Sequence, residues 1–298
     1  MLPDAPEELV IPRRHLSFSQ LQMIDGCPEQ HRQKYILGKP SVFSYEVLIG
    51  QASHKLPELC LRDIQEGRPM RSRSDALDAV AQYWREHEND ENISFTYRFS
   101  GAPISKDKCL SDALKIARVM YDELIPTVSE GTWMSEWDFN VPIPGKDGWD
   151  FKGSIDHVRV IPAINDGAEF TVIVDDWKTT GSMWKAAKAE ESLQATAYCW
   201  AIKQMVGVLP RRVTFQVFTR PTAKADVIWK TFETRRLASD LRKFEAKLKW
   251  AVKIVEGHSE DPERHSLQIP EWQYHKYCQF RSICTPWELL PKDPVSIR

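Results

Sequence analysis

No apolar run in the sequence approaches the ~20 residues that a helix needs to span a bilayer. The chain begins with acidic and proline residues in place of a positively charged and then apolar segment, so we expect no signal peptide. Glycine and proline are too few to indicate disorder, and 42% of the residues are hydrophobic, enough for a large core. We therefore expect a cytoplasmic protein with no membrane attachment.

A strong positive charge is also absent. The net charge is −2 at pH 7, which argues against bulk coating of nucleic acid but not against a local basic channel. No G-x4-G-K-[ST] phosphate loop occurs, so the chain carries no helicase motor. In a reducing compartment, the six cysteines do not indicate a disulfide framework.

The most distinctive stretch is 172–180, where a β-branched run ends abruptly in two acids, a tryptophan and a lysine. Side chains alternate along a strand, so Asp176 and Lys178 project from one face while Asp175 and Trp177 project from the other. A carboxylate and an ammonium at this spacing can hold a divalent cation and a water beside a phosphate. Taken alone, such a D-x-K sequence is most often a pair of surface side chains at a strand end.

A further acid, Asp156, lies upstream in the segment 153–158. The Asn-Asp-Gly turn at 165–167 separates that segment from the 172–180 stretch, and such a turn between β-branched runs predicts an antiparallel hairpin. The hairpin would bring Asp156 close to Asp176.

Helical spacing and capping residues predict helices over 17–27, 28–36, 44–66, 74–88 and 107–124, with Pro57 kinking or restarting the third. From residue 132 the chain alternates as strands do, which predicts strands over 133–142, 148–161, 169–179, 213–217 and 227–232. Helices are expected over 189–206 and 235–256. The last of these carries basic side chains on a face that is more often solvated than bound to DNA: Arg235, Arg236, Arg242, Lys243, Lys247, Lys249 and Lys253.

Three other features have two interpretations each. His54 follows small residues that allow a phosphate to approach, and it is equally a hydrogen-bonded helical histidine or a ligand. Gln194 and Tyr198 share one helix face, most simply as a half-exposed polar edge. The H-x2-C-x5-C segment from His275 to Cys284 is tight enough to be a metal-ligand set.

Together these pieces resemble the PD-(D/E)XK nuclease superfamily, and within it the RecB-like branch of CRISPR-associated and phage exonucleases. The resemblance covers roughly 17–284 and depends on motifs in the family's order: the 17–27 opening, Gly50-x3-His54, Gly153-x2-Asp156, Asp176-x-Lys178-Thr179, Gln194-x3-Tyr198 and the cysteine-bearing tail. It implies an α/β fold, a mixed central sheet flanked by helices. It also implies a single nuclease domain over 1–298, with a helical insertion at 60–130 and a Cys/His tail at 257–298 joined to Cys27.

The resemblance further implies a metal-dependent DNA exonuclease. Asp156 and Asp176 would ligate Mg²⁺ or Mn²⁺ through carboxylate oxygens, joined by the backbone carbonyl of Trp177. His54 would be another ligand, a role more natural with Mn²⁺. Lys178 would orient or deprotonate the attacking water and offset charge on the phosphate.

The remaining side chains have supporting roles in the family. The helix motif, here Gln194 and Tyr198, lies against the site and positions the lysine or the DNA. Asp175 faces away from the site and is expected to be structural.

In this branch, one early cysteine and three late ones bind a [4Fe–4S] cluster. Cys27, Cys278 and Cys284 match, but His275 stands where the family has cysteine. Three cysteines and a histidine are ordinary zinc chemistry, whereas four thiolates usually hold the cluster, so cluster, zinc and no metal all stay open, with the cluster slightly favoured. The remaining cysteines are expected to be core thiols: Cys60, Cys109 and Cys199.

We therefore expect a DNA exonuclease of recombination, repair or phage DNA processing, acting alone or with a helicase or recombination partner protein. One alternative is an inactive, nuclease-like DNA-binding subunit, against which the intact Asp156, Asp176 and Lys178 argue. The other alternative is a structure- or site-specific endonuclease.

Overall fold

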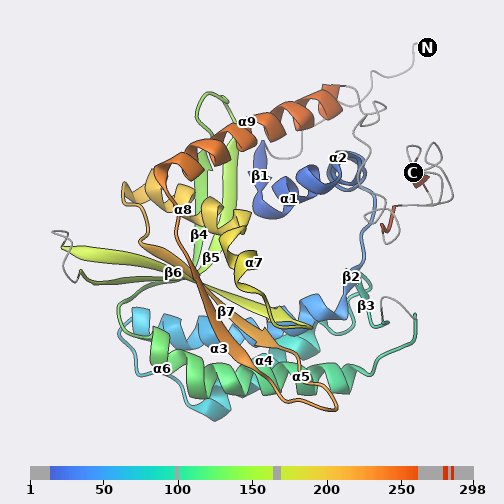
Figure 1. The fold of residues 1–298 in the computed structure, drawn as a ribbon. Helices are drawn as coiled ribbons and strands as arrows, with labels where there is room; N and C mark the ends of the chain where they lie inside the picture. The colour runs from blue at the N-terminus through green and yellow to red at the C-terminus, as the bar shows by residue number, and fades with distance from the viewer. Residues whose placement is uncertain (1–13, 98–100, 164–168, 261–277, 281–282, 285–298) are drawn as a thin grey trace, which may run out of the picture. The chain divides into compact units, whose positions relative to one another are not determined.

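The computed structural model describes residues 14–97, 101–163, 169–260, 278–280 and 283–284 (Figure 1). The chain forms two compact units. The larger unit comprises 42–139 and 153–244, and the smaller unit comprises 1–41, 140–152 and 245–298. The expected single domain with an insertion at 60–130 stays a prediction.

The larger unit is built on a mixed sheet in the order β4-β5-β6-β7-β8. Its strands are β4 (Thr132–Pro142), β5 (Asp150–Pro162), β6 (Phe170–Thr180), β7 (Arg212–Thr219) and β8 (Trp229–Thr234). β5 and β6 pair antiparallel, which confirms the predicted hairpin, although its turn at 165–167 lies outside the described residues. β6 and β7 are parallel and β7 and β8 antiparallel, so the predicted α/β fold with a mixed central sheet is confirmed.

A parallel pair of strands requires a crossover connection, and two helices supply it between β6 and β7. They are α7 (Ala186–Glu190) and α8 (Leu193–Val206). Ser192 caps α8 by accepting a hydrogen bond from the N–H of Ala195, and Gly207 ends it at φ 78°. The single helix predicted over 189–206 is therefore two, because the cap at Ser192 begins a new one.

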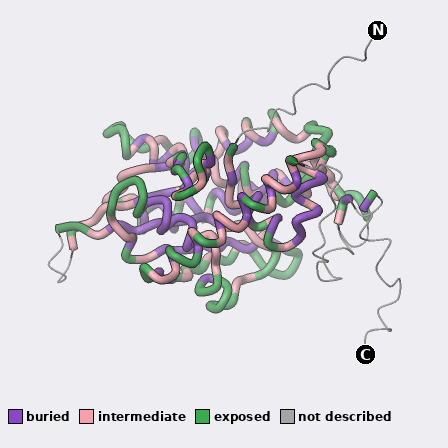
Figure 2. Tube along the Cα trace, turned by 90° about the horizontal axis from the view of Figure 1, so that it is seen from above, coloured by how far each residue is buried: buried purple, intermediate pink, exposed green. Residues whose placement is uncertain are grey.

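Other helices of the larger unit precede the sheet in sequence. They are α3 (Tyr45–Gln65), α4 (Arg73–His87), α5 (Lys106–Val119), the π-helical turn η2 (Met120–Leu124) and α6 (Ile125–Val128). Serine caps begin α3, α4 and α5, as capping signals predict. α3 continues through Pro57, so the predicted restart of the helix there is wrong. The core joins these helices to the sheet through Trp177 and Phe218, and Figure 2 shows how much of the chain is buried.

Two short strands lie in segments for which the sequence predicts no strand. β2 (Phe43–Ser44) pairs in parallel with β3 (Ile93–Ser94), and an isolated bridge joins Thr96 to Pro103. The two-residue strands are too short to show the period-two alternation by which a strand is recognised in sequence.

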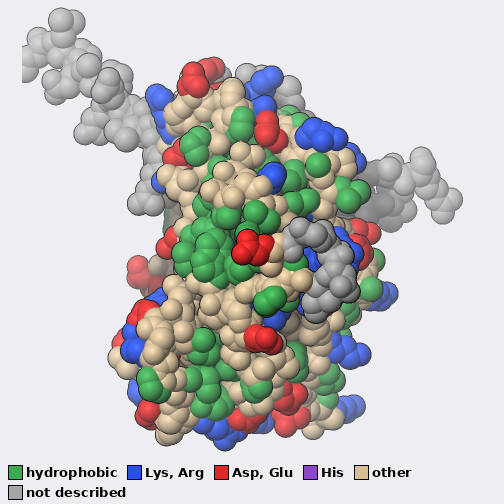
Figure 3. All heavy atoms as spheres, turned by 90° about the vertical axis from the view of Figure 1, so that its left-hand side faces the viewer, with side chains coloured by type: hydrophobic (Ala, Val, Ile, Leu, Met, Phe, Trp, Pro, Cys, Tyr) green, Lys and Arg blue, Asp and Glu red, His purple; other side chains and the backbone are tan. Residues whose placement is uncertain are grey.

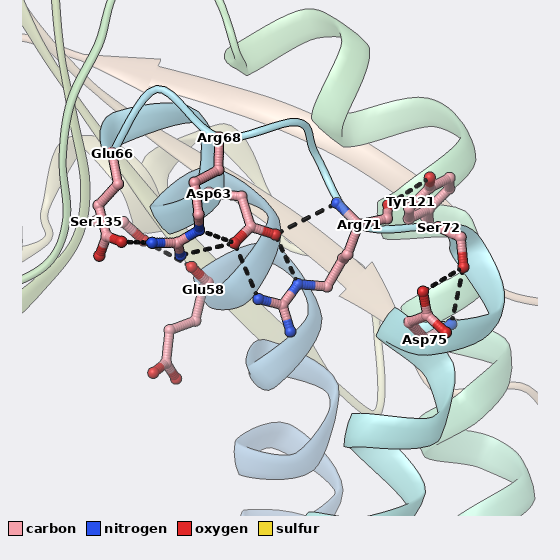
Figure 4. A network of polar contacts seen from close by, with 9 residues as sticks. All are labelled: Glu58, Asp63, Glu66, Arg68, Arg71, Ser72, Asp75, Tyr121 and Ser135. Carbon is pink, nitrogen blue, oxygen red and sulfur yellow. Dashed lines mark hydrogen bonds and ion pairs between the residues drawn. The ribbon is translucent and has the colours of Figure 1, made fainter.

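Polar side chains fix the turn between α3 and α4 (Figure 4). The carboxylate of Asp63, which is almost fully buried, accepts hydrogen bonds from the side chains of Arg68 and Arg71 and from the N–H of Arg71. Hydrogen bonding by Arg71 is the main cause that lowers the pKa of Asp63 to about 2, against the opposing effect of burial. Nearby, Ser135 of β4 donates its hydroxyl to the carbonyl of Glu58 on α3.

In the smaller unit, β1 (His15–Ser17) pairs in parallel with the first residues of β5. After β1 come α1 (Phe18–Gly26), capped by Ser17, then α2 (Pro28–His31) and the π-helical η1 (Arg32–Ile36). α9 (Ala238–Glu260) begins in the larger unit and continues in the smaller one. Within the smaller unit, Lys247 of α9 forms an ion pair with Asp25 of α1 at 2.6 Å.

None of the helices in the described residues is long and apolar enough to cross a membrane. Figure 3 shows acidic and basic side chains interspersed on one face of the molecule, without a region of one sign.

Candidate active site

Asp176 is the centre of a group of polar side chains near the end of β6. It is fully buried, and its carboxylate accepts a hydrogen bond from the hydroxyl of Tyr198 (2.8 Å) and pairs with the ammonium of Lys178 (2.5 Å). Gln194 in turn donates to the hydroxyl of Tyr198 at 2.7 Å. Because residues 176 and 178 lie on one face of the strand, the sheet brings acid and lysine together against the first turns of α8.

Asp156 of β5 lies next to this group. The β5–β6 ladder pairs His157 with Asp175, so the following pair is Asp156 and Asp176, with both side chains on the same face. The carboxylate of Asp156 accepts a hydrogen bond from the backbone N–H of Trp177 (2.7 Å). His54 of α3 approaches it, with Nδ1 at 4.0 Å from the Asp156 carboxylate.

The two carboxylates have raised pKa values. Burial is the largest cause for Asp176, and the neighbouring Asp156 adds to it, so its pKa rises to about 6 despite the opposing Lys178. Burial also raises the pKa of Asp156. Bringing two acids together out of water is unfavourable unless a cation compensates.

Lys178 and His54 differ in their charge states. Burial tends to lower the pKa of Lys178, but Asp176 and Asp156 together raise it, so the ammonium stays charged. Burial and the charge of Lys178 lower the pKa of His54 to about 4, so its imidazole is neutral at pH 7. The Nε2 atom of His54 is buried and has no hydrogen-bond partner in the described part of the chain.

These residues fit a divalent cation. Carboxylate oxygens and a neutral imidazole are suitable ligands, and a cation relieves the repulsion between the buried Asp176 and the half-buried Asp156. No three histidine, cysteine, aspartate or glutamate side chains of the described residues are already spaced as a complete metal-binding group. A cation here would therefore also use water, phosphate or a backbone oxygen such as the Trp177 carbonyl.

Asp175 belongs to a buried network on the other face of β6. It accepts hydrogen bonds from Arg159 (2.7 Å from Nε) and Thr214, and lies 3.2 Å from His157 Nδ1. Burial raises its pKa, but the hydrogen bonds from His157 and Arg159 outweigh burial and lower the pKa to about 2. These contacts hold β6 against β5 and β7, as a structural role requires.

Glu136 of β4 is a neighbour of the site that sequence patterns did not reveal. It has a positive φ of 49°, and burial together with Asp156 and Glu58 raises its pKa to about 8. Regular alternation would group it with Met134 and Asp138, which gives no reason to select it. The feature that distinguishes Glu136 is its positive φ, which is visible only in the structure.

The cysteines lie in both units of the chain, and three of them are buried thiols of the larger unit as expected. Cys60, Cys109 and Cys199 are buried in the larger unit. In the smaller unit, burial raises the pKa of Cys27 to about 11, and the nearby Cys278 and Cys284 contribute to that rise. Gln30 donates to the sulfur of Cys278 at 3.4 Å. His275 lies outside the described residues, so what this group binds stays a prediction.

Comparison with known protein families identifies the family of this chain. A family model described as the PD-(D/E)XK nuclease superfamily matches residues 15–285. No curated protein matches the chain.

Two solved structures are similar at low identity. A candidate exonuclease from Eubacterium rectale has 12% identity and a TM-score of 0.48, covering 89% of this chain and 94% of its own. An alkaline exonuclease from Laribacter hongkongensis has 11% identity and a TM-score of 0.29, covering 78% and 96% respectively. Both TM-scores lie below 0.5, so neither structure is used to infer function. Only the match to the family model is used for that purpose.

Proposed function

Because the chain belongs to the PD-(D/E)XK nuclease superfamily, we propose that it is a Mg²⁺- or Mn²⁺-dependent deoxyribonuclease that degrades DNA from its ends. The observation that carries this proposal is the position of two carboxylates, the buried Asp176 and the half-buried Asp156, on neighbouring strands beside the charged Lys178. Metal-dependent phosphodiester hydrolysis uses this combination of negatively charged metal ligands and a nearby positive charge.

Each side chain has a chemical role in this proposal. A divalent cation bound by Asp156 and Asp176 would neutralise the phosphate and acidify a water, with His54 and the Trp177 carbonyl as further ligands. Lys178 keeps its ammonium beside the acids, where it orients the attacking water and offsets charge on the phosphate.

The helix α8 holds the acid in place. The hydroxyl of Tyr198 fixes one oxygen of the Asp176 carboxylate and leaves the other for the lysine and the cation. Gln194 fixes the tyrosine. The Gln194–Tyr198 pair therefore orients the acid directly, and through it the lysine.

The experiment is digestion of end-labelled single- and double-stranded DNA, and of closed circular DNA, with Mg²⁺, Mn²⁺ or EDTA. We expect mononucleotides or short products from linear DNA, no cleavage of circles, and no activity in EDTA. Asp176→Ala should abolish cleavage, while Asp138→Ala, an exposed acid on β4, should leave it unchanged. Cleavage of circles would indicate an endonuclease, and DNA binding without cleavage would indicate an inactive subunit.

We place the chain in the RecB-like branch, with a role in recombination, repair or phage DNA processing. The sequence contains no phosphate loop, so double-stranded substrates would be opened by a helicase or recombination partner.

We also propose that Cys27, Cys278, Cys284 and His275 bind a [4Fe–4S] cluster or, alternatively, zinc. The proximity of the three cysteines in the smaller unit supports this assignment.

A further inference from the structure

Glu136 lies on β4 at the level of the two catalytic acids. β4 pairs with β5, and two contacts fix their alignment: the N–H of Val160 donates to the carbonyl of Gly131, and the ring of Phe139 covers Gly153. Between these two contacts the residue numbers rise along β4 and fall along β5, so the two strands are antiparallel. This alignment places Glu136 near Asp156. The electrostatic influence of Asp156 on Glu136 agrees with this placement.

The backbone at Glu136 departs from regular strand geometry. It is the one non-glycine residue in the described ranges with a positive φ, 49°. A side chain is uncommon in this region, and an irregularity in a strand re-aims the side chain that it carries. Such conformations persist where the surrounding structure enforces them, and they concentrate at functional sites.

The surroundings of Glu136 contain cations, but these are already paired. Lys55 and Arg62 both form ion pairs with Glu58, at 2.5 and 3.0 Å. Within the described ranges, no hydrogen bond or ion pair engages the carboxylate of Glu136. A half-buried acid that faces another acid without a partner is unfavourable, unless a cation joins them.

We propose that Glu136 is a third carboxylate of the active site and binds the divalent cation together with Asp156 and Asp176. This inference rests on the proposed function and extends its ligand set. The three carboxylates and the neutral imidazole of His54 come from β4, β5, β6 and α3. Among the described residues they are not already spaced as a complete metal-binding group, so binding of the cation would draw their donor atoms together. Ca²⁺-sized and Mn²⁺-sized cations are commonly held by several carboxylates, and each added ligand raises affinity.

The direct test is a titration of the full-length protein with Mn²⁺ alone. Binding is measured by calorimetry and by the electron paramagnetic resonance signal of free Mn²⁺. Loss of Glu136 as a ligand, in Glu136→Gln, should weaken Mn²⁺ binding by about tenfold or more. Asp138→Asn is the matched control, because Asp138 is an exposed acid two residues further along the same strand. The control should bind Mn²⁺ as the unmodified protein does.

A second variant separates ligation from a structural role. Glycine accepts a positive φ without strain and removes the acid, so Glu136→Gly should keep or raise the thermal unfolding temperature while weakening Mn²⁺ binding. If Glu136 only supported the fold, Glu136→Gly would lower the unfolding temperature and leave Mn²⁺ affinity intact.

Comparison with Asp176→Asn separates the role of Glu136 as a ligand from the existence of the metal site itself. Normal Mn²⁺ binding by Glu136→Gln, with binding lost in Asp176→Asn, would overturn the role of Glu136 and leave the nuclease assignment standing. Normal binding by both variants would overturn the metal site itself and, with it, the proposed function.

Discussion

Lys178 has the most constrained environment of any charged side chain in the site. Its ammonium contacts Asp176 and is influenced by Asp156, and both acids keep it protonated although burial acts against the charge. A lysine in this state is better suited to orienting a water and stabilising negative charge than to removing a proton. We therefore expect Lys178 to act electrostatically.

From this environment we predict that Lys178→Ala lowers kcat strongly and changes DNA affinity little. One of many basic contacts contributes little to total DNA binding, whereas charge beside the reacting phosphate acts on the transition state. Single-turnover cleavage rates and binding titrations of a labelled oligonucleotide measure the two effects. Lys230→Ala, an exposed lysine on β8, is the control and should alter neither. An equal loss of affinity and rate would assign Lys178 to substrate binding.

A second prediction concerns Asp63, whose pKa is lowered to about 2 in the folded protein from an ordinary value of 3.8. A lowered pKa contributes stability that is complete above about pH 4 and is lost as the pH falls towards 2. Asp63→Asn should therefore reduce the free energy of unfolding by at most about 2 kcal/mol at neutral pH, and by roughly half as much near pH 3. Urea unfolding at both pH values measures the difference.

The control for Asp63 is Asp122→Asn, which removes an exposed ion pair with Arg73. Because exposed pairs contribute little, this variant should be close to neutral at both pH values. A pH-independent loss in Asp63→Asn would show that the carboxylate charge is not what stabilises the turn.

At the scale of elements, Arg236 connects the helices of the crossover to the sheet. It is buried, and its guanidinium donates to the carbonyls of Glu190 and Ser192 and to the hydroxyl of Thr196. The Glu190 carbonyl lies at the end of α7, where a helix leaves its last carbonyls unpaired, whereas Ser192 and Thr196 lie at the start of α8. Arg236 thereby fixes the origin of the helix whose next turns carry Gln194 and Tyr198.

We predict that Arg236→Lys lowers both thermal stability and kcat, because an ammonium cannot reach all of these acceptors in the guanidinium geometry. The KM for DNA should change less than kcat, since the affected contacts lead to Asp176 and not to the substrate. Arg235 is an exposed neighbour, and Arg235→Lys should leave thermal stability, kcat and KM unchanged. A stability loss with unchanged kcat would restrict Arg236 to a structural role.

Regular local patterns made much of this site predictable. Strand alternation predicted that Asp176 and Lys178 share a face, and the spacing of Gln194 and Tyr198 predicted a shared helix face, which depends only on backbone periodicity. Arg236 was grouped with a solvated helix face, but α9 begins at Ala238 and the arginine is buried. Its role depends on contacts about 40 residues away in sequence, which no local pattern contains.

Glu136 shows the other limit of sequence patterns. It is distinguished by a positive φ within a strand, which no sequence pattern displays. Pro57 is similar in kind, since a proline predicts a break but tertiary packing maintains α3 through it. Tertiary context therefore decides the residues that depart from regular geometry.

At the scale of the whole molecule, the cysteines of the smaller unit join the early and late parts of the chain. A metal shared by Cys27 and Cys278 would close a loop of roughly 250 residues, which in chain-entropy terms stabilises the fold by several kcal/mol. We predict that Cys284→Ser lowers thermal stability and soluble yield before it affects the rate of cleavage. Cys199→Ser, a buried thiol of the larger unit, is the comparison for general core damage.

Metal analysis identifies the occupant of this site. Anaerobically purified protein should be brown and contain iron if a cluster is bound, and colourless with zinc if His275 has changed the preference. Absence of both metals would leave Cys278 and Cys284 as ordinary thiols.

The division of the chain between the two units also sets an order of events during synthesis. Residues 42–244 contain the whole of the larger unit, whereas the smaller unit requires residues 1–41 together with 245–298. Chains emerge from the ribosome N-terminus first, so Asp156, Asp176 and Lys178 can be assembled before Cys278 and Cys284 exist. The first 41 residues must wait, without their partners, for most of translation. If the cysteines bind a metal as proposed, its loading would be the closing step of maturation, and a shortage of that metal would leave the N-terminal segment without its partners.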